Sequence, residues 1–132
     1  MIEISTDKNK LQIGVIHAFL TNSYWAKGRT INEVKKTIEH CLCFGVYLKG
    51  NQIGFARVAT DYTVFAYLMD VFILPENRGN GYSKQLMKAI IEEPQLSTCK
   101  VWMLKTKDAH NLYKQFGYTE LQHPEKLMER LL

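Results

Sequence analysis

The residues with the clearest use in chemistry lie in one segment, where an apolar stretch runs into Arg78-Gly-Asn-Gly-Tyr-Ser83. Gly79 and Gly81 allow the main chain to come close to a bulky ligand. The helix expected directly after them begins with N–H groups that lack a helical partner and carry partial positive charge. Arg78 either adds a cation or positions the loop, and Ser83 offers a hydroxyl. The segment predicts an anion site of pyrophosphate size, with a plain strand-to-helix turn as the alternative.

Two common phosphate-binding motifs are excluded by the same residues. A P-loop needs Gly-Lys-Ser/Thr after its glycines, and Gly81 is followed by Tyr82 instead. The third glycine of a dinucleotide-binding fingerprint is also missing. A bare Gly-x-Gly is a weak signal, so the prediction depends on its place between a strand and a helix.

Asp70 is the one charged residue in the apolar segment Val64–Leu74. A carboxylate in such a place has to be paired with a cation or become neutral. Asp70 is therefore a candidate proton acceptor or amine anchor, and a buried, hydrogen-bonded residue at a strand bulge is an equally good interpretation. Asp61 and His110 are weaker candidates for the same role.

The hydrophobic pattern predicts the elements that would position these residues: a strand, two helices, three strands, a helix, a strand, a helix and a strand. The first strand is expected over residues 1–5 and the first helix over about residues 8–22. Thr30 and Glu33 match a capping box at the start of the second helix. The apolar stripe of that helix is expected to be Ile31, Val34 and Ile38.

The later strands are expected at residues 42–48, 53–59, 64–74, 100–104 and 118–121. The third of these is apolar throughout and is typical of a central strand buried on both faces. A hairpin turn is expected over residues 49–52, with Gly50 and Asn51 suited to positive φ. Asp108 is expected to cap the last helix and Gly117 to end it. The pattern predicts an α/β (α+β) domain with one sheet and a central strand-helix-strand unit.

The composition is that of one globular domain over residues 1–132, with 46% hydrophobic and 23% charged residues. No stretch approaches the roughly 20 apolar residues of a membrane span, and no secretory signal is evident, so a cytoplasmic location is expected. Cys41, Cys43 and Cys99 are expected to be reduced thiols, and no metal site is expected because no second ligand pair has suitable spacing. The net charge of +4 suits an anionic ligand but is too small to indicate nucleic acid.

At these residues the sequence resembles the GNAT superfamily of N-acetyltransferases. The family's cofactor signature, Gln/Arg-x-x-Gly-x-Gly/Ala, corresponds to the segment in which Arg78 and Gly81 match and Ser83 replaces the last small residue. A second family motif, Ala-x-x-x-Tyr-x-x-x-Gly-Phe/Tyr, matches Ala109–Tyr118, and Thr106 stands where the family often has Asn. Two motifs at a suitable separation are more specific than either alone.

The similarity extends over about residues 11–121, and segments 24–29 and 44–47 resemble a small bacterial single-domain subgroup. The resemblance implies a GNAT-like single mixed, mostly antiparallel sheet flanked by about four helices, with a central β-α-β cofactor-binding unit. It also implies direct transfer of an acetyl group from acetyl-CoA (coenzyme A) to an amine. The residues implied to bind the cofactor are Val71, Phe72, Ile73, Arg78, Gly79, Asn80, Gly81, Tyr82, Ser83 and Asn111.

Tyr113 is the match for the family's general acid, which would protonate the leaving thiolate. The usual tyrosine pKa near 10 keeps the hydroxyl protonated at neutral pH, as an acid requires. The alternative is that Tyr113 is a core residue on a helix face. A backbone N–H between Val71 and Ile73 could polarise the acyl carbonyl, and a water chain could take the amine proton in place of Asp70.

The acceptor is expected to be a primary amine of a small, amino-acid-like molecule. The loop before the second helix contains Tyr24, Trp25 and Arg29, and in the family layout this region overhangs the acceptor side. Tyr67 could also face the acceptor. Their aromatic rings and guanidinium could bind an amine that carries a carboxylate. The alternative for Trp25 is that it pins the loop to the core. A non-catalytic acyl-CoA binding module and a protein N-terminal or lysine acetyltransferase are the competing functions, and a homodimer is compatible with the resemblance.

Overall fold

The computed structural model describes residues 1–132 and contains one five-stranded sheet in which the spatial order of the strands equals their chain order. The strands are β1 (Ile2–Ser5), β2 (Leu42–Leu48), β3 (Asn51–Thr60), β4 (Phe65–Ile73) and β5 (Val101–Leu104). Neighbouring strands are antiparallel from β1 to β4, whereas β4 and β5 are parallel. The expected single mixed, mostly antiparallel sheet is therefore confirmed.

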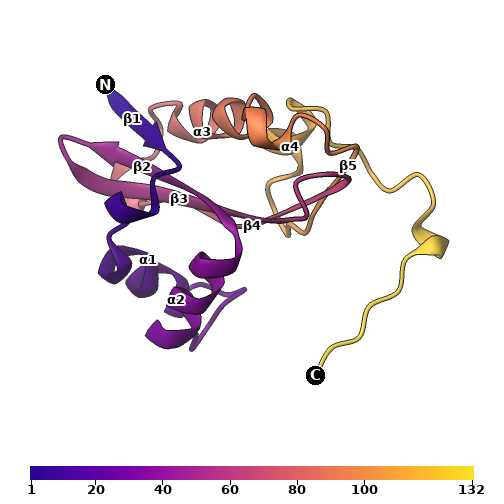
Figure 1. Ribbon diagram of the computed structural model, residues 1–132, viewed down its shortest axis with the longest axis horizontal. Helices are drawn as coiled ribbons and strands as arrows, with labels where there is room; N and C mark the ends of the chain where they lie inside the picture. The colour runs from indigo at the N-terminus through magenta and orange to yellow at the C-terminus, as the bar shows by residue number, and fades with distance from the viewer.

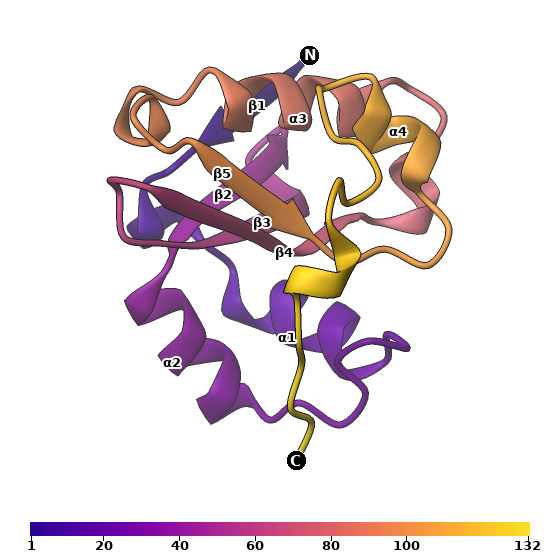
Figure 2. The ribbon, with the colours of Figure 1, turned by 90° about the vertical axis from the view of Figure 1, so that its right-hand side faces the viewer.

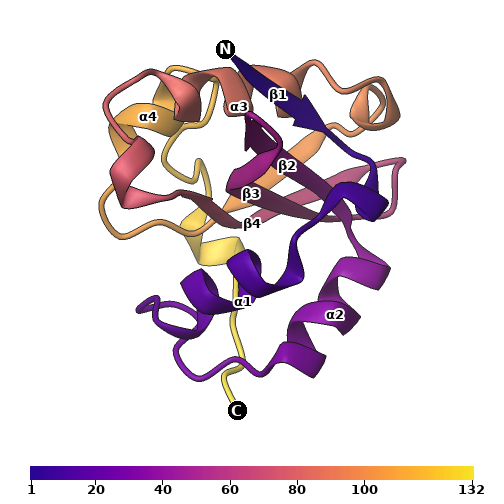
Figure 3. The same ribbon diagram turned by 90° about the vertical axis from the view of Figure 1, so that its left-hand side faces the viewer.

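Four α-helices flank the sheet in two layers, as Figure 1 and Figure 3 show. They are α1 (Ile13–Thr21), α2 (Ile31–His40), α3 (Tyr82–Ile91) and α4 (His110–Lys114). The pair α1 and α2 covers one face and the pair α3 and α4 the other, so the sheet separates two hydrophobic cores. Cys41 and Cys43 lie in the α1–α2 core and Cys99 in the α3 core, and all three are free and buried.

The first helix begins later than the apolar spacing predicted. Residues 8–10 form a short 3₁₀ turn, and α1 starts only at Ile13. Between them, the Gln12 N–H donates to Oε1 of Gln52 at 2.7 Å, and the Gln52 N–H donates to Oε1 of Gln12 at 3.1 Å. This reciprocal pair holds Gln12 in an extended conformation, which separates the two helical segments.

The capping box at the start of α2 is confirmed. The Glu33 N–H donates to the Thr30 hydroxyl at 3.1 Å, and the Thr30 N–H donates to the Glu33 carboxylate at 2.8 Å. The backbone hydrogen bond from Thr30 lowers the pKa of Glu33. Of the predicted stripe, Val34 and Ile38 are buried, but Ile31 is 42% exposed and faces away from the core.

The hairpin between β2 and β3 is tighter than expected. Lys49 and Gly50 adopt positive φ values of 51° and 80°, and Asn51 already belongs to β3. The two-residue turn matches the twist of the flanking strands.

Strand β4 separates from β5 halfway along its length, and this separation creates the space for a site. The parallel pairing joins Phe65–Leu68 to Val101–Leu104 and ends there. On the other side of β4, the register with β3 shifts between Phe55 and Arg57. Beyond Leu68, the edge of β4 that faced β5 has no strand beside it. Contrary to the prediction, burial alternates along β4 from Phe65 to Phe72, because one face is partly exposed, and only at its end are two consecutive residues, Phe72 and Ile73, both buried.

Two expectations near the C-terminus are wrong. Residues 118–121 form no strand, because their backbone does not pair with β5. Asp108 does not cap α4; instead, the Ala109 N–H donates to the Thr106 hydroxyl at 3.0 Å. Gly117 follows α4 at a positive φ of 91°, as expected of a residue that ends a helix. None of the helices is long and apolar enough to span a bilayer.

Candidate active site

A row of unpaired N–H groups surrounds the start of α3. Gly79 and Gly81 adopt φ values of 85° and 78°, and Gly81 is the N-cap of the helix. The first backbone hydrogen bond of the helix is donated by Gln85 to the Gly81 carbonyl at 3.2 Å, so the N–H groups of residues 79–84 donate to no acceptor in the chain. A methyl group added to either glycine would meet no atom within 4 Å. The loop is therefore an open cradle of donors at the positive end of a helix, which suits a phosphate group.

Arg78 positions this cradle. Its Nε donates to the Ile73 carbonyl at 2.9 Å, which fixes the loop against the end of β4. The Asn80 side-chain amide donates to the Asn77 carbonyl at 3.1 Å and to the Arg78 carbonyl at 3.4 Å, which closes the loop on itself. The terminal guanidinium nitrogens of Arg78 form no ion pair, so its charge is available to a ligand.

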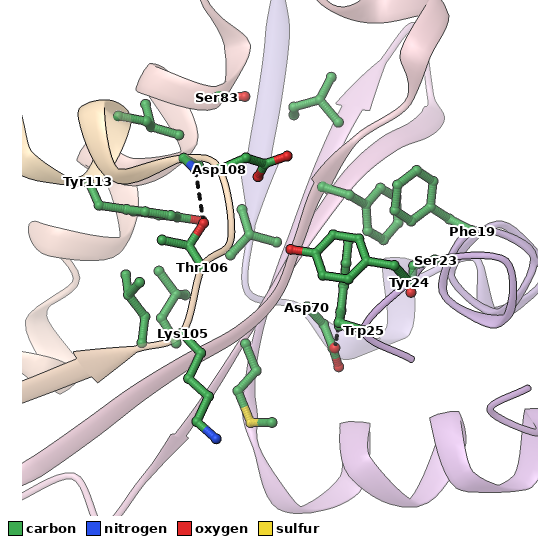
Figure 4. Close-up of a pocket in the computed structure, with 18 of the residues that line it drawn as sticks. Phe19, Ser23, Tyr24, Trp25, Asp70, Ser83, Lys105, Thr106, Asp108 and Tyr113 are labelled. Carbon is green, nitrogen blue, oxygen red and sulfur yellow. Dashed lines mark hydrogen bonds between the residues drawn. The ribbon is translucent and has the colours of Figure 1, made fainter. Parts of the chain in front are cut away.

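A cavity of about 700 Å³ extends from this loop along the open edge of β4 to the segment between α1 and α2. Figure 4 shows Tyr113 and Thr106 on one side of it, Phe19, Tyr24 and Trp25 on the other, and Asp70 on the strand between them. The predicted site residues that line it are Tyr24, Trp25, Arg29, Tyr67, Asp70, Val71, Phe72, Ile73, Arg78, Ser83 and Tyr113.

The remaining predicted residues lie outside this wall. The cradle residues Gly79, Asn80, Gly81 and Tyr82 adjoin Arg78 and Ser83 but are not part of the wall itself. Asn111 is exposed, and its carbonyl accepts a hydrogen bond from the Gln115 side chain at 3.1 Å. The structure therefore brings together all of the predicted cofactor residues except Asn111.

Tyr113 combines burial with a free hydroxyl. Its side chain is 9% exposed, packs edge-on against Tyr118 with ring centroids 5.9 Å apart, and makes no hydrogen bond through its hydroxyl within the chain. Burial raises the pKa of Tyr113 to about 12, and electrostatic interactions with Tyr24 and Asp108 add to the effect. The hydroxyl therefore keeps its proton at neutral pH and faces the cavity as a donor.

Asp70 is paired rather than free. Its Oδ2 accepts from Arg29 at 2.6 Å and from Nε of Arg57 at 2.8 Å, and its Oδ1 accepts from the Trp25 indole N–H at 3.0 Å. Asp70 and Arg57 are 5% and 6% exposed. Of the interpretations that the sequence left open, the paired carboxylate at a bulge is the one present, since two guanidiniums and an indole occupy its oxygens. The geometry offers no support for Asp70 as the proton acceptor.

The two weaker candidates for that role are also placed by the structure. The Asp61 carboxylate accepts from the N–H groups of Thr63, Val64 and Phe65, and these hydrogen bonds lower its pKa. It therefore holds the turn before β4, and neither it nor His110 lines the cavity.

Several residues of the site were missed by sequence reasoning. They are Phe19, Arg57, Lys105, Thr106 and Asp108. Arg57 had a usable signal, because it is the one charge in the apolar stretch 53–59, as Asp70 is in its own strand. Phe19 stacks on Phe72 at a centroid distance of 4.1 Å and builds the wall behind Trp25. Phe19 lies within the expected first helix, residues 8–22, where helical hydrophobic spacing indicates only a core residue.

The far end of the cavity is aromatic and cationic. Arg29 is partly exposed there, and Lys105 lines the wall. The Lys107 ammonium lies 5.4 Å from the centroid of the Tyr24 ring. The arrangement thus offers phosphate donors at one end, a protonated hydroxyl in the middle, and cations with aromatic rings at the other end.

Comparisons with known proteins agree with this geometry. Residues 39–120 match a family described as the acetyltransferase (GNAT) domain. A Gibberella zeae protein named as an acetyltransferase is 29% identical over an alignment of 138 positions, which spans 86% of this chain and 77% of that protein. A GNAT acetyltransferase structure from Xanthomonas campestris has a TM-score of 0.98 and 47% identity and covers 100% of this chain and 94% of its own. A Clostridium acetobutylicum acetyltransferase with acetyl-CoA shares the fold, with a TM-score of 0.74 and 14% identity over 99% of this chain and 96% of its own.

Proposed function

Since this chain belongs to the GNAT family of acetyltransferases, which use acetyl-CoA, we propose that it acetylates a primary amine of a small, amino-acid-like molecule. The transfer is direct, with both substrates bound in the one cavity. The whole of residues 1–132 serves as one catalytic domain in this proposal.

The observation that carries the proposal is the cradle at the start of α3 next to the open edge of β4. Residues 79–84 present unpaired N–H groups in an open space, as a pyrophosphate requires. The unpaired edge of β4 then offers the main-chain groups of Val71 and Ile73 to an extended arm that leads from the pyrophosphate into the cavity. A small anion bound in the cradle alone would leave the rest of the cavity, along the edge of β4, without an occupant.

The chemistry follows from the order of the groups along the cavity. Acetyl-CoA supplies an acetyl group activated as a thioester. A backbone N–H in the Val71–Ile73 segment is the proposed donor to the acyl oxygen, on which negative charge develops. Tyr113 donates its proton to the sulfur as the C–S bond breaks and the C–N bond forms. Since Asp70 is paired, the excess proton of the amine passes to water rather than to a carboxylate, and Tyr113 regains a proton from water after the transfer.

The acceptor class follows from the far end of the cavity. The Lys105 ammonium is already paired with Glu129 at 2.6 Å. Arg29 favours a negative group, and the rings of Tyr24, Trp25 and Tyr67 favour a flat or apolar body. An amine that also carries a carboxylate satisfies both. The Asp70 carboxylate does not cancel this preference, because Arg57 shares its charge.

Titration of the protein with acetyl-CoA and with coenzyme A, followed by an amine screen that detects thiol release, tests the proposal. Gly81→Glu places bulk and negative charge in the cradle, and we expect it to weaken acetyl-CoA binding by at least about 100-fold, because a buried or close like-charge contact costs several kcal/mol. Gly50→Glu is the matched control, since Gly50 has a φ of 80°, meets open space and lies in the β2–β3 turn.

If both variants bound acetyl-CoA equally weakly, backbone strain would explain the loss, and the assignment of residues 79–84 as the pyrophosphate site would be wrong. Tight binding of acetyl-CoA without thiol release in the presence of any amine would instead support a binding module.

A further inference from the structure

Four aromatic rings form a continuous wall along one side of the cavity. Phe19 stacks on Phe72 with ring centroids 4.1 Å apart, and Trp25 lies 6.0 Å from Phe19 at an interplanar angle of 50°. Tyr24 meets the Trp25 ring edge-on at 5.2 Å. All four residues line the cavity, and Figure 4 shows three of them, Phe19, Tyr24 and Trp25, on the side opposite Tyr113. These four rings, here called the aromatic wall, come from α1, from the loop before α2 and from β4.

The aromatic wall is held in place by contacts outside the cavity. The Trp25 indole N–H donates to the buried Asp70 carboxylate at 3.0 Å. Phe72 is 4% exposed and has Phe55 beside it, at a centroid distance of 6.1 Å. Phe19 lies between the rings of Trp25 and Phe72 and is itself half-buried. Because packed interiors resist displacement, a ligand that reaches this wall meets a surface that yields little.

The acyl end of the cofactor reaches this wall. The cavity is lined by Ser83 at the start of α3 and by Phe19 on α1. Figure 2 shows the pair α3 and α4 above the sheet and the pair α1 and α2 below it. An arm that starts at the cradle and fills the cavity therefore crosses from one face of the sheet to the other at the open edge of β4. The acyl group at the end of that arm arrives beside Phe72, which lies in the α1–α2 core.

We propose that the aromatic wall restricts the acyl donor to short chains and that Phe19 sets the limit, an inference that rests on the proposed function for the path of the arm. Further methylene groups would force the packed rings out of their preferred rotamers. In an apolar pocket, one methylene group changes selectivity by about 10- to 200-fold. Phe19 is the determinant because it can be shortened without breaking a hydrogen bond, whereas Trp25 is bound to Asp70 and Phe72 is part of the core. An acetyl group is accepted, and a butanoyl group, two methylene groups longer, is disfavoured.

Calorimetric titration of the full chain with acetyl-CoA and with butanoyl-CoA measures this limit without an acceptor. The native chain is expected to bind acetyl-CoA at least about tenfold more tightly than butanoyl-CoA. Phe19→Ala removes the ring between Trp25 and Phe72, and we expect it to bind the two thioesters with affinities within about threefold of each other. The gain should come from tighter binding of butanoyl-CoA, because the cradle and the edge of β4 are unchanged in this variant.

Phe65→Ala is the matched control. Phe65 is also on an aromatic stack, with the Tyr67 ring 6.3 Å away at an interplanar angle of 10°, but it does not line the cavity. This variant should keep the native preference for acetyl-CoA. Phe19→Leu provides a second truncation that retains an apolar, helix-favouring side chain in α1, and its preference should lie between those of the native chain and Phe19→Ala.

The proposal is overturned by a native chain that binds both thioesters equally, by Phe19 variants that keep the full native preference, or by a Phe65→Ala variant that loses it. Titration with coenzyme A, which lacks an acyl group, separates this result from the fate of the proposed function. A native chain that binds coenzyme A but does not distinguish the thioesters would retain the cradle and lose the role of the aromatic wall. A native chain that binds none of the three ligands would contradict both.

Discussion

At the residue scale, Tyr113 and Tyr118 form a natural comparison. The two rings are in contact, and burial raises the pKa of both hydroxyls. The Tyr118 hydroxyl is buried without a partner, however, and Tyr118 lines only the grooves beside β5, whereas Tyr113 faces the main cavity. A proton donor has to reach the reacting atoms, so only Tyr113 qualifies for that role.

Removal of the Tyr113 hydroxyl should therefore affect turnover specifically. We expect Tyr113→Phe to lower kcat by about 100-fold, within the range typical of a lost general acid, while acetyl-CoA affinity stays the same. Tyr118→Phe should leave kcat within about twofold, because it removes an unpartnered buried hydroxyl. Steady-state kinetics and acetyl-CoA titration of both variants provide the measurement. Unchanged kcat in Tyr113→Phe would mean that solvent protonates the leaving thiolate.

The placement of the glycine loop and of Tyr113 at one cavity could be anticipated because each belongs to a motif that is contiguous in the chain. The pairing of Asp70 could not, because its partners lie 13 and 41 residues away, on β3 and in the loop before α2. A charged residue in an apolar strand indicates that a partner of opposite charge exists, but the sequence does not show which residue it is. The same reasoning applied to Arg57 would have suggested the pair.

At the element scale, the cluster around Asp70 ties the loop before α2 to the sheet. Trp25 and Arg29 both bind the Asp70 carboxylate from the loop, and Arg57 binds it from β3. Asp70 adopts a positive φ of 55°, which turns its side chain toward the loop at the point where β4 leaves β5. Burial opposes the charge of Arg57, but its hydrogen bond to Cys41 and its pairing with Asp70 raise its pKa.

Asp70→Asn should release the loop. The amide can still accept from Trp25, but two guanidiniums lose their counter-charge, which for buried pairs costs about 3–5 kcal/mol of stability. We expect the KM for the amine to rise more than the KM for acetyl-CoA, and the fluorescence of Trp25 to shift. Glu3→Gln removes only the exposed pair with Lys10, whose charges are screened by solvent, and should leave stability nearly unchanged. A fall in kcat alone, with an unchanged amine KM and an unchanged Trp25 signal, would restore Asp70 as a proton acceptor.

The elements that the sequence mispredicted share a cause. The first helix was expected to be continuous because apolar spacing does not reveal the Gln12–Gln52 pair, whose members are 40 residues apart. Residues 118–121 have strand-like composition but no partner strand in their own chain. A strand forms only when a neighbouring strand pairs with it, so the pattern of one segment cannot by itself predict a strand. Elements that are fixed locally, such as the capping box at Thr30, were predicted correctly.

At the scale of the whole molecule, buried tyrosines link stability to alkaline pH. Burial raises the pKa of Tyr113 to about 12, above the value near 10 of an unfolded tyrosine. The folded state then retains a proton that the unfolded state releases. Its stabilising contribution is complete below pH 10 and is lost as the pH rises through about 12, with a maximum of about 2–3 kcal/mol.

Denaturant unfolding at a series of pH values tests this linkage. The native free energy of unfolding should fall between about pH 10 and 12, and Tyr113→Phe should reduce the slope in that window, since phenylalanine does not ionise. Tyr62→Phe is the comparison variant and should reduce the slope less, because Tyr62 is 44% exposed, although burial also raises its pKa. Equal slopes in native and Tyr113→Phe chains would mean that Tyr113 ionises in the folded state as it does in the unfolded one.

The three cysteines lie on opposite sides of the sheet, so their reaction with a thiol reagent can report local opening on each side separately. Cys41 and Cys43 are enclosed by the α1–α2 core and Cys99 by the α3 core, and burial raises the pKa of Cys43 to about 12. A thiol reagent can react only when the enclosing layer separates from the sheet. Labelling rates followed by mass spectrometry would therefore give two opening free energies from one native sample, one for the acceptor side and one for the cofactor side. If bound acetyl-CoA slowed only the labelling of Cys99, the two helical layers of this enzyme would be shown to open independently of each other.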